Sequence, residues 1–107
     1  MPRRGKNVKV RRASHNVFRD LGFPPGEAAH LKIRADLMIE VQNAITVKGL
    51  RQAEAASLFG VSQPRVSDLL RGRIDLFSTD TLIDMLACLG VRVRLQLKPS
   101  RNTRKVA

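Results

Sequence analysis

Hydrophobic positions between residues 25 and 48 recur every three or four positions, which predicts one long amphipathic helix. Gly49 follows at a position where helices commonly end. The apolar residues form two stripes: Leu31, Ala35, Met38 and Ile45, and Ile33, Leu37, Val41 and Ala44. A helix that is apolar over so wide an arc is usually covered on both sides. One side is expected to pack on the later helices. The other side meets an N-terminal turn, a second subunit or a protein partner, and packing within the chain is the favoured choice.

Shorter helical patterns lie on either side of this segment. Residues 16–21 predict a single turn that ends at Gly22, and residues 52–71 predict two short helices with a turn between them. Ser78 is a good N-cap for a last helix that ends near Gly90. The core stripe of that helix is Leu82, Met85, Leu86 and Leu89. The pattern therefore predicts a mostly α-helical domain.

Residues 91–97 change to strict alternation, which predicts a strand with one apolar face. Its apolar positions are Val91, Val93, Leu95 and Leu97, and they alternate with Arg92, Arg94 and Gln96. Alternation of this kind occurs nowhere else in the chain, and a single strand leaves its backbone donors and acceptors unpaired. The simplest partner is the same strand of a second copy, paired antiparallel about a two-fold axis. The four apolar residues therefore predict a homodimer.

The two short helices within residues 52–71 have the features of a helix-turn-helix. Ala56 is small enough for a close helix crossing, and Gly60 permits the positive φ that a sharp turn requires. Ser62 can cap the second helix, and Pro64 in its first turn loses no needed hydrogen bond. Val66, Leu69 and Leu70 are expected to anchor that helix to the core. An ordinary helical hairpin, in which Gly60 is only a C-cap, is the alternative.

The opposite face of the second helix carries side chains that suit DNA. Gln63 can pair with adenine and Arg65 with guanine, whereas Pro64 can contact a thymine methyl. Ser67 can bind a base or a phosphate, and Asp68 can accept from cytosine or hold a neighbouring arginine. The complete set of predicted DNA contacts is Arg51, Gln52, Ser62, Gln63, Pro64, Arg65, Ser67, Asp68, Arg71 and Arg73. Gln52 and the arginines at 51, 71 and 73 are expected to reach phosphates.

The charge of the chain fits this interpretation. Its 107 residues include 20 Lys and Arg against 9 Asp and Glu, a net charge of +11, which favours a polyanionic partner. Most of this excess lies outside residues 52–71. We expect a flexible basic arm at 1–14, a domain at 15–97 and a basic tail at 98–107. The arm either follows the DNA backbone or enters a minor groove, or it is only a solvated tail.

Other classes of protein have less support. No apolar run reaches the roughly 20 residues of a membrane span, and the basic N-terminus lacks a signal-peptide core. A cytoplasmic, nucleoid-associated protein is expected, in line with the lone Cys88. We expect no enzymatic activity, no cofactor and no metal site, because His15, His30 and Cys88 are isolated from one another. General RNA binding is disfavoured because the chain has only four aromatic residues on which bases could stack.

Residues 50–76 resemble the helix-turn-helix of the XRE (Cro-type) family, in which a Gln begins each of the two helices, here Gln52 and Gln63. The resemblance covers about residues 14–97, and its most specific part is the Gln-Pro-Arg-Val-Ser-Asp run at 63–68. The chain is similar over these residues to a subfamily of small regulators that includes HigA-like antitoxins encoded beside RelE-like (HigB) toxins. Arg51 departs from the family, which often has a Thr cap at that position.

This resemblance implies a lambda-repressor-like domain of five helices, whose C-terminal strand pairs across a dimer. It further implies an autorepressor that binds double-stranded DNA at a palindromic operator. An antitoxin that mainly masks a RelE-like toxin, with DNA binding secondary, is the alternative.

Overall fold

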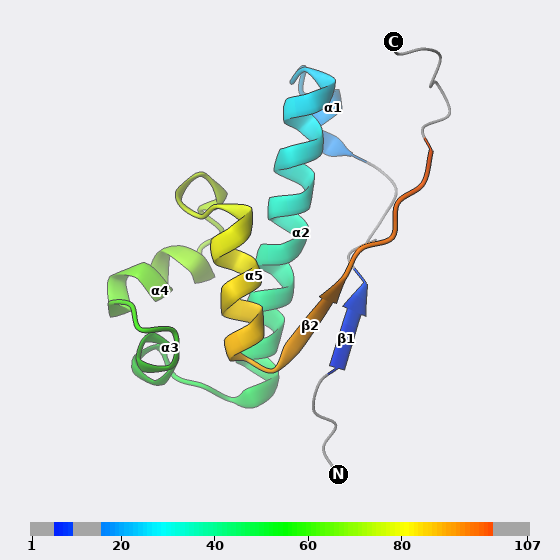
Figure 1. Ribbon diagram of the computed structural model, residues 1–107. Coiled ribbons are helices and arrows are strands. Elements are labelled where there is room, and N and C mark those ends of the chain that lie inside the picture. Colours follow the sequence, from blue (N-terminus) through cyan, green and yellow to red (C-terminus); the bar gives the residue numbers. More distant parts are fainter. Residues whose placement is uncertain (1–5, 10–15, 100–107) are drawn as a thin grey trace.

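The computed structural model describes residues 6–9 and 16–99. In these residues the chain forms five α-helices, one 3-10 turn and two short strands (Figure 1). In chain order they are β1 (Lys6–Lys9), α1 (Val17–Asp20), α2 (Pro25–Lys48), α3 (Gln52–Phe59), α4 (Gln63–Leu70), η1 (Ile74–Leu76), α5 (Thr79–Cys88) and β2 (Val91–Arg94). The predicted mostly α-helical fold with five helices is confirmed.

The long helix α2 is the central element, and its two ends follow from local sequence. Pro25 occupies the first turn, where its missing N–H is not needed. Gly49 ends the helix in the left-handed conformation with φ 66°, and its N–H donates to carbonyls of the last turn. In front of α2, Asn16 caps α1 by accepting from the Phe18 N–H, while its Nδ2 donates to the Ala28 carbonyl at 3.2 Å. That second bond fixes α1 on the first turns of α2.

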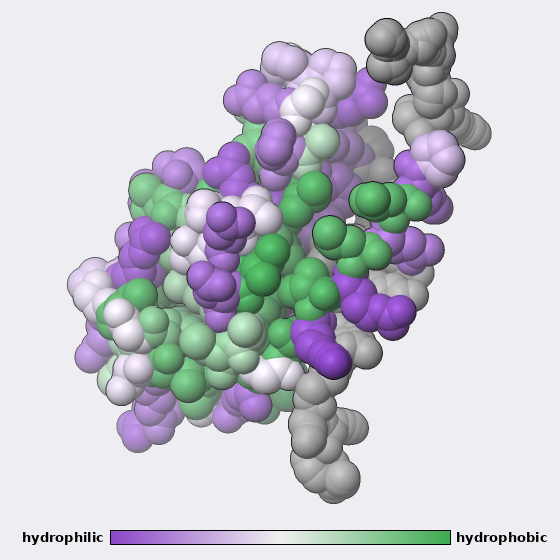
Figure 2. Space-filling view, viewed as in Figure 1, coloured by the Kyte–Doolittle hydropathy of each residue, from purple (hydrophilic) through white to green (hydrophobic). Residues whose placement is uncertain are grey.

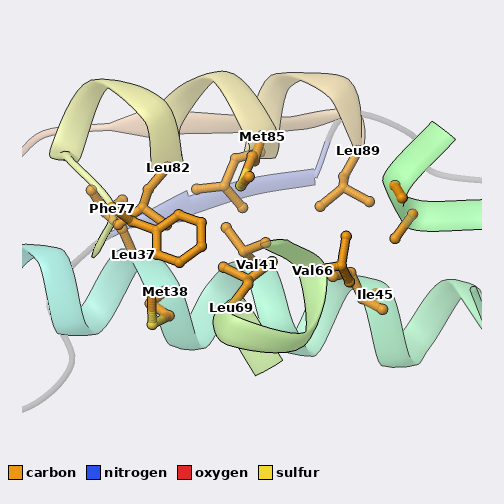
Figure 3. Close-up of a cluster of buried hydrophobic side chains, with 13 residues drawn as sticks. Leu37, Met38, Val41, Ile45, Val66, Leu69, Phe77, Leu82, Met85 and Leu89 are labelled. Carbon is orange, nitrogen blue, oxygen red and sulfur yellow. The ribbon is translucent and has the colours of Figure 1, made fainter. Parts of the chain in front are cut away.

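One core cluster joins α2 to α3, α4 and α5 (Figure 3). Phe77, which is 1% exposed, points into this cluster beside Leu37 and Leu82. Along α2 the buried line runs through Leu37, Val41 and Ile45, with Met38 beside it. Each of the two predicted stripes therefore contributes two buried residues, whereas Ile33 is 42% exposed. Positions four apart lie nearly above one another on a helix, so a single line suffices to cover α5 and α4.

The last helix, α5, matches its prediction. The Ser78 hydroxyl accepts a hydrogen bond from the Thr81 N–H at 3.1 Å, as expected of an N-cap. Its predicted core stripe is buried, consisting of Leu82, Met85, Leu86 and Leu89. Cys88 lies off this stripe and is exposed. The packing of α5 on α2 forms the centre of the domain.

The strand at the end of the domain differs from its prediction. β2 ends at Arg94 rather than residue 97, and it pairs in parallel with β1 of the same chain, with Lys6 opposite Val91 and Lys9 opposite Arg94. The four residues of β1 can pair only four residues of β2. The expected flexible arm at 1–14 thus contains a strand at 6–9. A parallel pair requires a long connection between its strands, and here the helices provide it. The rest of that arm and the tail from residue 100 lie outside the described residues.

None of the described helices has the length and apolar character of a membrane span.

Candidate nucleic-acid interface

The turn between α3 and α4 has the expected helix-turn-helix geometry. Ala55 and Ala56 are buried, which lets α3 approach the core closely. Gly60 adopts φ 71°, a left-handed conformation that is strained for residues with a Cβ. The Val61 N–H donates to the Ala56 carbonyl at 3.0 Å and closes the end of α3. Next, the Ser62 hydroxyl accepts from the Arg65 N–H at 3.3 Å, so the predicted cap of α4 is confirmed.

Two side chains anchor α4 rather than three. Val66 and Leu69 are fully buried in the core cluster, but Leu70 is 37% exposed. The prediction that Leu70 anchors the helix is therefore wrong. Adjacent residues on a helix point about 100° apart, so a helix of eight residues that buries Val66 and Leu69 turns Leu70 to the edge of the contact.

Gln42 on α2 holds the end of α4 through a bond that the sequence analysis did not predict. Its Nε2 donates to the Leu69 carbonyl at 2.8 Å. The last carbonyls of a helix have no partner within it. The Leu69 carbonyl accepts from the Gly72 N–H at 3.1 Å, and Gln42 adds a second donor from a different element. The only signal in the sequence was that Gln42 is a polar residue beside the buried line of α2. That position does not indicate which backbone group the side chain binds.

Replacing Gln42 with Met is expected to lower the free energy of unfolding by about 0.5–1.5 kcal/mol, the usual net value of one hydrogen bond. The side chain keeps its length but loses its donor. Urea denaturation of the variant and of Asn43→Met, at the neighbouring exposed position, would measure the difference. Equal stability of the two variants would show that the bond to Leu69 contributes nothing.

The face of α4 that points away from the core presents the predicted polar side chains. Gln63 and Pro64 are exposed at its first turn, whereas Ser67 and Asp68 are half-buried farther along. Ser62, just before them, is also exposed. The N-terminal turn is therefore the most accessible part of α4.

Each of the four predicted DNA-contacting arginines already has a partner within the domain. The Arg65 guanidinium stacks over the ring of Phe77, 4.2 Å from its centroid. The other three lie beside carboxylates: Arg71 at 3.4 Å from Asp68, Arg51 at 3.9 Å from Glu54, and Arg73 at 3.9 Å from Asp75. One alternative predicted for Asp68, that it holds a neighbouring arginine, is thus confirmed.

The start of α3 has half of a capping box. The Glu54 carboxylate accepts from the Arg51 backbone N–H at 2.8 Å. Because an arginine side chain has no acceptor, the reciprocal bond that a Thr would make is absent at this position. Gln52 is exposed at the first position of α3, where the positive end of the helix dipole favours phosphate.

Among the described residues, no group of three His, Cys, Asp or Glu side chains could hold a metal ion.

This arrangement, a buried small-residue crossing, a left-handed glycine turn and a capped second helix with a polar outer face, defines a helix-turn-helix. A family model described as a helix-turn-helix domain matches residues 17–98. The chain belongs to this helix-turn-helix family. The match begins and ends close to the predicted domain at 15–97.

A solved structure, that of a "Putative XRE Family Transcriptional Regulator", is similar with a TM-score of 0.64 and 27% sequence identity. The match covers 76% of this chain and 91% of that one. A comparison with curated proteins gave no match.

Proposed function

We propose that this protein is a sequence-specific transcriptional regulator that reads its operator with α4. The observation that carries the proposal is the exposed first turn of α4, where Gln63 and Pro64 project from a helix held by Ser62, Val66 and Leu69. A recognition helix in the major groove contacts base edges with its N-terminal residues. Similarity to the regulator described above supports the same role.

The burial of each side chain suggests a division of labour. Gln63 is the principal candidate for base contact, because an amide can pair with adenine through two hydrogen bonds. Arg65 remains a predicted base contact, but its stacking on Phe77 restricts its reach. Gln52 and Arg51, at the start of α3, are placed to bind phosphate and so to orient α4.

Replacing Gln63 with Ala is expected to weaken binding to a selected operator by about 1–3 kcal/mol and to relax the preference at one base pair. The operator would first be selected from random duplexes. Fluorescence anisotropy on that operator and on its single-base variants would then measure the effect. Arg51→Ala is the matched comparison, and it should weaken binding to all the duplexes equally. An unchanged base preference in Gln63→Ala would exclude α4 as the recognition helix.

We also propose that the regulator binds a palindromic operator as a homodimer and represses its own gene. Leu95 and Leu97 directly follow β2 and are 74% and 87% exposed, an unusual state for large apolar side chains. Green, apolar residues form a band beside the segment that follows β2 (Figure 2). Within the described residues β1 pairs with only one edge of β2. A second copy meeting the other edge and these leucines would join two α4 helices in one dimer.

The antitoxin role implied by the family resemblance stays a prediction. Co-purification of a RelE-like toxin with this protein is the measurement that would test it.

A further inference from the structure

The positive charge of the chain is concentrated in two segments far apart in sequence. Residues 1–12 and 91–107 together contain twelve Lys and Arg and no Asp or Glu. Residues 13–90, which include the helix-turn-helix, contain eight Lys and Arg against nine Asp and Glu, a net charge of −1. The whole excess of +11 therefore belongs to the segments on either side of the helical domain.

The parallel pairing of β1 with β2 brings these two segments together. The backbone of Lys9 lies opposite that of Arg94, and Asn7 opposite Arg92. Because the strands are parallel and in register over four residues, each backbone position of β1 lies opposite one position of β2. The pairing thus holds four residues of one basic segment beside four residues of the other, which favours a shared anionic partner.

The arginines of β2 are available for such a partner. Val91 and Val93 are half-buried against the core, so the alternation turns Arg92 and Arg94 outward, and both are exposed. Neither arginine has an ion-pair partner among the described residues, in contrast to three arginines of the helix-turn-helix, Arg51, Arg71 and Arg73.

This basic sheet, formed by β1 and β2, lies on the far side of the domain from α4. Figure 1 shows α2 and α5 between the α3–α4 pair and the two strands. β2 packs on α5, and α5 packs on α2. A duplex seated in front of α4 would therefore have the body of the helical domain between itself and the basic sheet.

We infer that the basic sheet is a second DNA-binding surface, which holds the phosphates of a second duplex segment while α4 occupies the operator. One regulator would then bridge two segments of DNA. The inference rests on the proposed function in one respect: α4 must bind the operator to load the protein on the first duplex.

The spacing of the sheet arginines favours DNA over an acidic protein. Residues two apart on a strand are about 6.6 Å apart. Successive phosphates of one strand advance about 3.4 Å along the duplex axis while they turn around it, so their separation in space is of the same order as that of Arg92 and Arg94. Two arginines at this spacing can contact two phosphates of one strand, and a duplex offers such pairs along its whole length.

A sandwich assay with the full-length protein tests the inference. A selected operator duplex is immobilised and saturated with protein, and a labelled 30-base-pair duplex without the operator sequence is then added. The wild-type protein should capture the labelled duplex. The variant Arg92→Gln with Arg94→Gln should still bind the operator, but its affinity for the second duplex should fall about tenfold or more. The salt dependence of capture, as log K against log salt, should become shallower by about 1.8.

The matched control is Arg19→Gln with Lys48→Gln, which removes the same charge from exposed positions outside both surfaces and should capture normally. Equal capture by the two double variants, or the absence of capture by the wild type, would overturn the inference. Capture that single-stranded RNA or polyglutamate blocks at a much lower concentration than unlabelled duplex DNA would assign the sheet to that other polymer and reject DNA. Failure to load on the operator would contradict the function of α4 instead.

Discussion

Replacing both Leu95 and Leu97 with Asp is expected to convert the protein to a monomer and to weaken binding to a palindromic operator about a hundredfold or more. Both side chains are largely exposed within one protomer, so the substitutions should not disturb the core. In the proposed dimer they would place charges in an apolar contact between copies. Loss of the second half-site removes the gain from simultaneous binding, which commonly reaches 10²–10⁴.

Analytical ultracentrifugation at micromolar concentration would report the oligomeric state, and anisotropy on full and half operators would report the loss of affinity. Val17→Asp with Leu21→Asp is the matched control, since it adds the same charges at exposed apolar positions, one in α1 and one at its C-cap. A wild-type protein that is already monomeric, or a variant that remains dimeric, would contradict the proposed interface.

Replacing Phe77 with Ala is expected to lower the free energy of unfolding by about 3–5 kcal/mol, a large part of the stability of a small domain. Phe77 is among the largest fully buried side chains and contacts α2 and α5 as well as the Arg65 guanidinium. Its removal leaves a cavity at the junction of these elements. Chemical denaturation followed by circular dichroism would measure the loss.

Phe77→Leu separates the two contributions, because leucine fills most of the volume but cannot stack with Arg65. This variant should lose less stability than Phe77→Ala. Of the loss in Phe77→Leu, about 0.5–2 kcal/mol should come from the missing stacking. If Arg65→Gln in the Phe77→Leu background costs as much as it does in the wild type, the stacking makes no contribution.

The helical part of the fold could be predicted because its signals are local. Gly49, Gly60 and Ser78 end or begin helices through bonds to residues three or four positions away, and such bonds depend on the immediate sequence. The helix-turn-helix was predictable for the same reason. Its small residue, its glycine and its cap lie within seven positions.

The features that were missed depend on contacts between distant residues. Gln42 and the Leu69 carbonyl meet only after α2 and α4 have packed, and Arg65 meets Phe77 only after the chain turns back through η1. β1 gave no periodic signal, because Lys6–Lys9 contains a single apolar residue. Its partner could not be predicted, since pairing in parallel across the whole domain leaves no turn between the strands.

The pairing of β1 with β2 also fixes an order of assembly. Lys6 and its partner Val91 are 85 positions apart, which at 5–20 residues per second is roughly 4–17 s of synthesis on the ribosome. The helices, whose contacts are mostly closer in sequence, can fold in that interval. The sheet is therefore expected to close last during synthesis, and nascent chains should carry their first basic segment unpaired until then.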